Sequence, residues 1–196
     1  MLVTFRNQEL EVVNGDSQSF HLQFNMNFFN NDAPRKQVKG YLDVFDQFKV
    51  LTFSHVYRMK EPETIAKPDV AVPIMYTSYD HDCQGRDVDM ANMLCLQNMR
   101  KRVFTPFKTI KLSLRPIWDM APTKYGDVET GVRKVDNPWF DTALLTNAAG
   151  ERAPGMRSQN VHLGVLEHAL GRQMTVLATC RVLFRGRRNG LTYKSG

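Results

Sequence analysis

The longest uninterrupted strand pattern of the chain lies near its C-terminal end, in residues 172–185. Apolar side chains recur there at every second position, and the positions between them are polar or basic, apart from Leu177 and Leu183. Because the side chains of a strand point alternately to opposite faces, this pattern predicts a strand with one core face. Strands are usually about five or six residues long, so one of this length needs neighbours in a large sheet. The rest of the chain therefore has to supply partner strands.

Six further stretches have the alternation or the β-branched and aromatic composition of strands. They are residues 1–13, 20–28, 45–57, 70–76, 107–115 and 161–165. Polar residues interrupt the first stretch at 6–8, so the count comes to about eight strands. Two-residue hairpin turns are nearly absent and most connections are long, which is typical of two packed sheets. The predicted fold is all-β: a single eight-stranded antiparallel jelly roll, made of two packed sheets with long loops between the strands.

One segment between the strands has a helical pattern. Within residues 87–102, Met90 and Met93 fall on one side of a helix, and Asp87 or Asp89 is placed to cap its start. The pattern predicts a short helix inside a loop.

Two other segments are predicted to be loops. Residues 35–40 contain three basic side chains and follow a cluster of turn-forming residues. Residues 118–159 contain repeated Gly and Pro and follow no period. Long irregular loops in compact domains are uncommon and are usually functional. A chain of 196 residues has the length of one large domain, so we predict a single domain over residues 1–196, with 118–159 as its long loop.

The composition is that of a moderately basic globular protein. Lys and Arg number 26 against 20 Asp and Glu, which gives a formal net charge of +6 and a sequence pI near 9.3. This balance is compatible with nucleic-acid binding. No apolar run approaches the ~18 residues of a membrane-spanning helix, and the first residues lack the pattern of a signal peptide. We therefore expect no membrane insertion.

Motifs of catalysis and cofactor binding are missing from the sequence. The five histidines form no HxH or HExxH pair, and the three cysteines form no CxxC pair. No GxSxG, P-loop or GxGxxG sequence occurs either. The densest group of possible metal ligands, residues 79–89, is interpreted as a solvated acidic loop. We predict no enzymatic activity, no catalytic residue, no cofactor and no metal site.

Basic residues provide the clearest functional pattern. The predicted nucleic-acid contacts are Arg100, Lys101, Arg102, Lys108, Lys111, Arg115, Arg181, Arg185, Arg187 and Arg188. Strand alternation places Lys111 with Arg115 on one face and Arg181 with Arg185 on one face. Repeated cations suit a phosphate backbone, because each neutralised phosphate releases condensed counterions.

Aromatic residues lie close to these cations in the sequence. Phe104, Phe107 and Trp118 are candidates to stack on unpaired bases. The alternative interpretation is that the cations solubilise the outer faces of the sheets or lie in contacts between subunits. Both interpretations remain open at the level of the residues.

The order of the segments resembles the capsid proteins of circoviruses and related circular, Rep-encoding single-stranded DNA (CRESS-DNA) viruses. The similar stretches are residues 19–29, ending Phe-Asn-Met-Asn-Phe-Phe; 43–57, beginning Asp-Val-Phe-Asp-Gln-Phe; 72–82, Val-Pro-Ile-Met-Tyr-Thr-Ser-Tyr-Asp-His-Asp; 100–106, Arg-Lys-Arg-Val-Phe-Thr-Pro; and 175–185, ending Val-Leu-Phe-Arg. Together they cover most of the chain. The resemblance lies in the order and spacing of these pieces, since each piece alone is short and degenerate.

The resemblance implies a viral structural protein. In that family an eight-stranded jelly roll assembles with copies of itself into a small T=1 icosahedral shell around circular single-stranded DNA. The chain is accordingly expected to self-assemble, to package a single-stranded DNA genome and to be part of the virion. A host-cell surface receptor or glycan is a further expected partner, and assembly is expected in the host cell, in the nucleus for this family.

One feature departs from the family pattern. Family members usually begin with an Arg-rich arm that binds the genome and directs nuclear import, whereas Arg6 is the only Lys or Arg in residues 1–31. Either the arm is missing from this chain, or packaging relies on inward-facing residues of the shell. Two alternative functions are a non-viral single-stranded nucleic-acid-binding β protein and a ligand-binding jelly roll of the cupin or lectin type.

Overall fold

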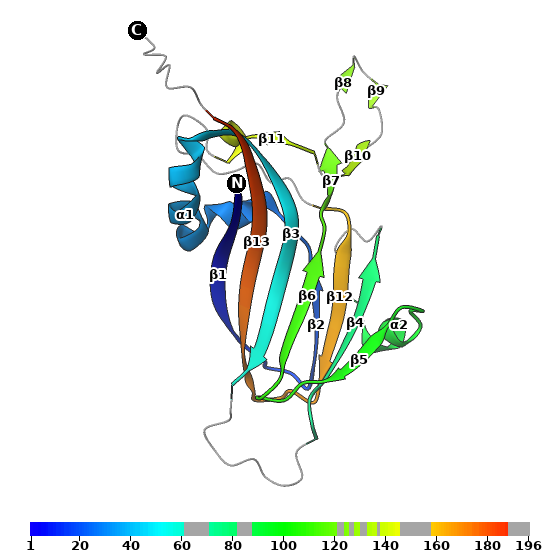
Figure 1. Cartoon of the computed structure of the whole chain (residues 1–196). Helices are drawn as coiled ribbons and strands as arrows, with labels where there is room; N and C mark the ends of the chain where they lie inside the picture. Colours follow the sequence, from blue (N-terminus) through cyan, green and yellow to red (C-terminus); the bar gives the residue numbers. More distant parts are fainter. Residues whose placement is uncertain are drawn as a thin grey trace.

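The stretch near the C-terminal end forms β13 (Gln173–Arg187), which lies inside the larger of two sheets (Figure 1). This computed structural model describes residues 1–60, 71–81, 88–120, 124–125, 128–129, 133–136, 138–145 and 158–187. β13 pairs with β1 (Leu2–Val12) on one side and with β3 (Phe45–Met59) on the other. The far side of β3 pairs with β6 (Thr109–Leu114) and with the short β11 (Phe140–Asp141). All of these pairings are antiparallel, so the long strand has the neighbours that its length requires.

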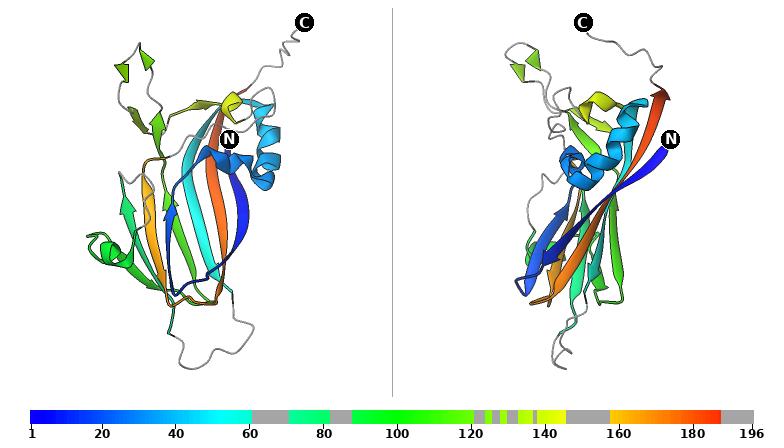
Figure 2. Two further views of the ribbon diagram at one scale, coloured as in Figure 1. Left: turned by 180° about the vertical axis from the view of Figure 1, so that it is seen from behind. Right: turned by 90° about the vertical axis from the view of Figure 1, so that its left-hand side faces the viewer.

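Four other strands form the second sheet. Its order is β2 (Ser17–Leu22), β12 (Val161–Glu167), β4 (Ile74–Asp80) and β5 (Arg100–Val103), again antiparallel throughout. The chain crosses repeatedly from one sheet to the other, and the two sheets pack together over one core (Figure 2). These two sheets form the predicted jelly roll, in which the short β11 is a ninth strand beside the eight longer ones, and the fold prediction is confirmed.

Short elements connect the strands. They are the 3-10 helices η1 (Met26–Asn30) and η2 (Thr142–Leu144), the helices α1 (Asp32–Leu42) and α2 (Met90–Leu94), and the strands β7 (Ile117–Met120), β8 (Lys124–Tyr125), β9 (Val128–Glu129) and β10 (Arg133–Asp136). The predicted loop at 118–159 thus contains short strands in its described part, where β7 pairs with β10 and β8 with β9. Neither α1 nor α2, nor any other helix in the described ranges, has the length and hydropathy to cross a membrane.

The predicted helix is confirmed, although it is shorter than the pattern suggested. α2 ends at Leu94, and the Asp89 side chain caps its start by accepting a hydrogen bond from the backbone N–H of Asn92 (2.7 Å). Residues 100–103 belong instead to β5, whose pairing with β4 overrides the weak helical periodicity.

The predicted strand at 20–28 is wrong in its second half. β2 ends at Leu22, and η1 begins after Asn25, whose side chain accepts a hydrogen bond from the backbone N–H of Asn27 (2.9 Å). Such side-chain bonds compete with a sheet ladder for the backbone. The even-numbered apolar residues of this half, Phe24, Met26 and Phe28, are nevertheless buried. The alternation therefore predicted the buried residues correctly, but it predicted the wrong backbone conformation.

The predicted basic loop at 35–40 is also wrong, because these residues form most of α1. Pro34, Val38 and Leu42 follow one another at four-residue spacing and are buried, whereas the basic residues lie on the exposed side. This spacing is the helical signal that the basic composition obscured.

The core between the sheets is rich in aromatic side chains. Phe5, Phe24, Phe48 and Phe184 are buried from strands and loops far apart in the sequence, and Trp118 is completely buried among them. On the core face of β13, Cys180 packs as a small apolar side chain, and burial raises the pKa of its thiol. Cys95, by contrast, is exposed.

Gly164 of β12 packs directly under an aromatic ring. It pairs with Phe20 of β2, and a Cβ atom at Gly164 would lie 2.1 Å from Cζ of that ring. We therefore expect Gly164→Ala to lower the free energy of unfolding by about 1–3 kcal/mol, the usual cost of overpacking. Urea denaturation measures this loss. Phe20→Leu in the same chain should recover part of it, and a Gly164→Ala chain as stable as the wild type would contradict the packing.

His55 of β3 makes folding stability depend on pH. Burial, with a smaller contribution from nearby His21, lowers the pKa of His55 to about 4. In the unfolded chain the pKa is near 6.5, so the unfolded state binds the proton first on acidification. Stability is then fully present above pH ~6.5 and falls by up to about 3 kcal/mol between pH ~6.5 and ~4.

The measurement for His55 is urea denaturation at pH 7 and at pH 4.5. His55→Gln should remove the share of the difference that His55 contributes and leave the smaller share of His162, whose pKa burial also lowers. His81→Gln, at an exposed histidine, should leave the difference unchanged. If the His55→Gln chain loses as much stability between pH 7 and pH 4.5 as the wild type, groups other than His55 cause the pH dependence.

Candidate nucleic-acid interface

The sheet β1-β13-β3-β6 (Figure 1) carries several of the predicted contact residues on its outer face. Arg181 and Arg185 lie at positions of β13 that face away from the core, and both are exposed. In the strand register, Arg181 lies between Thr4 of β1 and Thr52 of β3. Lys111 of β6 is exposed and belongs to the same face through its pairing with β3. One cation of the first predicted group, Lys111, thus shares a surface of the sheet with Arg181 and Arg185 of the second.

Cations dominate this outer sheet face. The basic residues at its outward positions are Arg6, Lys49, Arg58, Lys111, Arg181 and Arg185. None of the outward positions that the structure describes on these four strands is Asp or Glu, because Glu9, Glu11 and Asp46 lie at positions of the opposite face. The short β11 adds one outward carboxylate, Asp141, which pairs with Gln47 and accepts a hydrogen bond from the backbone N–H of Ala143 (2.8 Å). A face with this charge distribution attracts polyanions.

An aromatic side chain that the sequence analysis missed lies among these cations. The Arg185 guanidinium lies 3.9 Å from the centroid of the Trp139 ring, and its Nε donates a hydrogen bond to Oε1 of Gln47 (2.8 Å). The Nζ of Lys49 lies 5.8 Å from the same centroid. Trp139 stands directly before the buried Phe140, so strand alternation places Trp139 on the outward face. This alternation could have identified the outward tryptophan from the sequence. An aromatic ring beside cations is the combination on which unpaired bases stack.

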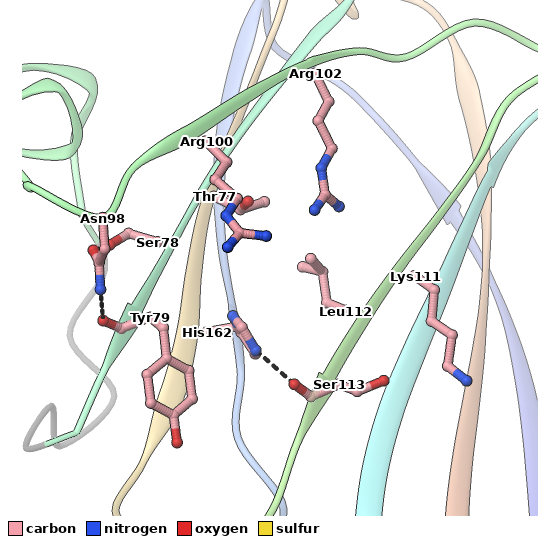
Figure 3. Close-up of a pocket in the computed structure, with 10 residues that line it drawn as sticks. All are labelled: Thr77, Ser78, Tyr79, Asn98, Arg100, Arg102, Lys111, Leu112, Ser113 and His162. Carbon is pink, nitrogen blue, oxygen red and sulfur yellow. Dashed lines mark hydrogen bonds between the residues drawn. The ribbon is translucent and has the colours of Figure 1, made fainter.

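A second group of cations lines a hollow between β5 and β6 (Figure 3). The hollow has a volume of about 570 Å³, and its lining residues are Thr77, Ser78, Tyr79, Asn98, Arg100, Arg102, Lys111, Leu112, Ser113 and His162. Only Leu112 among them is apolar, and none carries a carboxylate. We refer to this hollow as the β5-β6 cleft. It combines three of the predicted contact residues with His162 from β12.

His162 connects the two sheets at the base of the β5-β6 cleft. Its Nε2 lies 2.6 Å from the backbone carbonyl oxygen of Ser113, which can only accept, so Nε2 carries the proton. Burial lowers the pKa of His162, and the positive charges of Arg102 and Arg100 act in the same direction, whereas the backbone carbonyls of Ser113 and Ser78 oppose the shift. The ring is therefore neutral at pH 7.

Side-chain bonds hold the opposite wall of the β5-β6 cleft. The Ser78 hydroxyl donates to Oδ1 of Asn98, and Nδ2 of Asn98 donates to the backbone carbonyl of Tyr79 (2.6 Å). These bonds attach the segment just before β5 to β4. They fix the starting point of the strand that carries Arg100 and Arg102.

The remaining predicted contact residues are spread over other places. The Nζ of Lys101 lies 5.7 Å from the centroid of the Tyr76 ring and does not line the cleft, and Lys108 is exposed in the turn before β6. Arg115 follows β6 and is exposed. Arg187 ends β13, but its side chain and the whole of Arg188 lie outside the described residues.

Two of the three predicted stacking residues are wrong. Phe104 and Trp118 both have 0% exposure, so neither can stack on a base. Both side chains are packed in the apolar core, although basic residues lie close to them in the sequence. Phe107 is 89% exposed in the turn between β5 and β6 and remains a candidate.

Comparison with solved structures finds the same fold along almost the whole chain. The crystal structure of the 60-mer of the capsid protein of BFDV (beak and feather disease virus, a circovirus) has a TM-score of 0.66 and 12% sequence identity, covering 94% of this chain and 93% of that chain. The decameric form of the same capsid protein has a TM-score of 0.54 and 14% identity, covering 95% and 99%. No protein-family model matches the chain, and no curated protein sequence matches it. The predicted resemblance to circovirus capsid proteins is confirmed at the level of the fold.

Proposed function

We propose that this chain is a viral capsid subunit, which assembles with copies of itself into a small T=1 icosahedral shell around single-stranded DNA. The observation that carries the proposal is the likeness of the whole jelly roll to the capsid protein of BFDV, at a TM-score of 0.66 over 94% of the chain. The role is structural and non-catalytic, and the chain acts as a single domain.

The outer sheet face supports the second half of the proposal, the enclosed DNA. Its cations lie on four adjacent strands with no carboxylate at the described outward positions, so a phosphate backbone can cross them in many registers. Trp139 adds a surface for unpaired bases beside Arg185. In a closed shell we assign this face to the interior.

Purified protein provides the test of assembly. Negative-stain electron microscopy and analytical ultracentrifugation should find uniform closed particles, because one subunit with closing head-to-tail contacts gives shells of one size. A species that stays monomeric or dimeric across salt and pH would contradict the shell.

The enclosed nucleic acid needs a separate measurement. Particles are treated with nuclease, and the protected nucleic acid is extracted and digested with enzymes specific for single-stranded DNA, double-stranded DNA or RNA. We expect protected single-stranded DNA. Uniform particles that protect only RNA or double-stranded DNA would leave the shell in place and refute the proposed cargo.

A further inference from the structure

The cations of the β5-β6 cleft converge on one place instead of following a line. Arg100 and Arg102 lie two positions apart on β5, so their side chains leave the strand on the same side. Both guanidinium groups extend into the hollow on the same side as the His162 ring (Figure 3). Like charges aimed at one hollow repel each other, and an anion between them would remove that repulsion.

The lining of the β5-β6 cleft favours an anion with oxygen atoms at its surface. Guanidinium groups match phosphate oxygens in a bidentate manner, with short charge-assisted hydrogen bonds. The volume of about 570 Å³ falls in the range of roughly 300–1,000 Å³ typical of small-molecule sites, so the cleft has room for a nucleotide-sized ligand. Leu112 is the one aliphatic side chain of the lining, and no carboxylate lies opposite the cations.

We infer that the β5-β6 cleft is a phosphate-binding site, in which Arg100 and Arg102 hold the phosphate oxygens and Lys111 stands at the rim. Lys111 also belongs to the outer sheet face, so the cleft opens toward the surface proposed to contact DNA. The phosphate belongs either to the packaged DNA strand or to a free nucleotide or polyphosphate. The first of these two sources rests on the proposed function. The chemistry of recognition is the same for both sources.

The pKa of His162 provides a way to detect phosphate binding within the β5-β6 cleft. This residue lies in the lining of the cleft, and the charges of Arg102 and Arg100 already contribute to the lowering of its pKa. A phosphate bound beside these cations offsets their effect, so the pKa of His162 should rise on binding. By linkage, the affinity for phosphate should increase as the pH falls through the pKa of His162.

The test uses inorganic pyrophosphate and a short oligothymidylate, each titrated by calorimetry into the folded full chain. Three chains are compared: the wild type, a double variant with Arg100→Gln and Arg102→Gln, and a Lys101→Gln control. Lys101 is a matched control, since it lies between the two arginines on the same strand but outside the lining of the cleft. We expect the double variant to bind pyrophosphate roughly 100-fold more weakly, the loss of two hydrogen bonds to a charged group. The control should change by less than about twofold.

Further measurements distinguish a loss of phosphate binding from a loss of folding. A double variant with Arg100→Lys and Arg102→Lys keeps both charges and should retain part of the affinity. In nuclear magnetic resonance spectra of the wild type, pyrophosphate should shift the ring signals of His162 and leave those of His168 in place. Absence of pyrophosphate binding in the wild type, or an equal loss in the Lys101→Gln control, would overturn the inference.

The two sources of phosphate, and the two proposals, separate in the same experiment. Displacement of pyrophosphate by the oligothymidylate supports the strand as the source. Pyrophosphate binding in the cleft without any binding of the oligothymidylate supports the site and counts against the proposed DNA cargo. If the wild type binds no pyrophosphate but the double variant fails to assemble, the cleft is a contact between copies of the chain and the inference is wrong.

Discussion

Replacing Val182 with Asp is expected to prevent the chain from folding. Val182 has 0% exposure in β13, where it pairs with Val3 of β1 and Val50 of β3. A carboxylate at this position is buried without a partner, which costs about 4–5 kcal/mol or more, whereas domains are stable by only about 5–15 kcal/mol. The variant should therefore be insoluble or should lack a cooperative urea transition.

The neighbouring position is the matched control for Val182. Leu183 lies on the outer sheet face beside Lys49, and it is partly exposed. We expect Leu183→Asp to remain folded and to change the free energy of unfolding by less than about 1 kcal/mol, as surface substitutions usually do. Circular dichroism and urea denaturation of both variants provide the comparison. A folded Val182→Asp chain together with an unfolded Leu183→Asp chain would mean that the two faces of β13 are assigned the wrong way round.

The core face of β13 illustrates what the sequence could predict. Strict alternation from Met174 to Phe184 reflects burial on one side only, and the burial of apolar side chains contributes most to the stability of such a strand. The same logic found β3 and β6, because apolar positions of these strands also face the core. It found β12 as well, although Val161, Leu163 and Val165 are buried in a second apolar cluster on the other face of their sheet. It failed at residues 23–30, where side-chain hydrogen bonds of Asn25 favour a 3-10 helix while the same apolar residues stay buried.

The β5-β6 cleft illustrates what the sequence could not predict. Arg102, Lys111 and His162 come from three strands, and they meet only because β5 lies two strands away from β12 and opposite β6. Strand order depends on the packing of whole sheets, and local alternation does not contain it. The basic residues were found from composition, but their separation into an outer sheet face and a cleft required the topology.

On the proposed function, charge reversal at Arg181 and Arg185 is expected to remove the enclosed DNA and to leave the shell in place. Both side chains are exposed on β13, so Arg181→Glu with Arg185→Glu should leave the fold intact, apart from the contacts of Arg185 with Trp139 and Gln47. Each arginine that contacts a phosphate contributes about one unit to the slope of log affinity against log salt concentration. The slope for oligothymidylate binding should therefore fall by about two in the double variant.

A control of equal charge separates this contact from a general electrostatic effect. Lys36→Glu with Lys39→Glu lowers the formal net charge of +6 by the same amount, but at exposed positions of α1 instead of the outer sheet face. We expect this control to keep most of the salt slope and to protect single-stranded DNA from nuclease, while particles of the Arg181 and Arg185 variant are empty. If both variants lose salt slope and DNA protection equally, DNA binding depends only on the net charge of the chain. An unchanged slope in the Arg181 and Arg185 variant would place the DNA on another surface of the jelly roll.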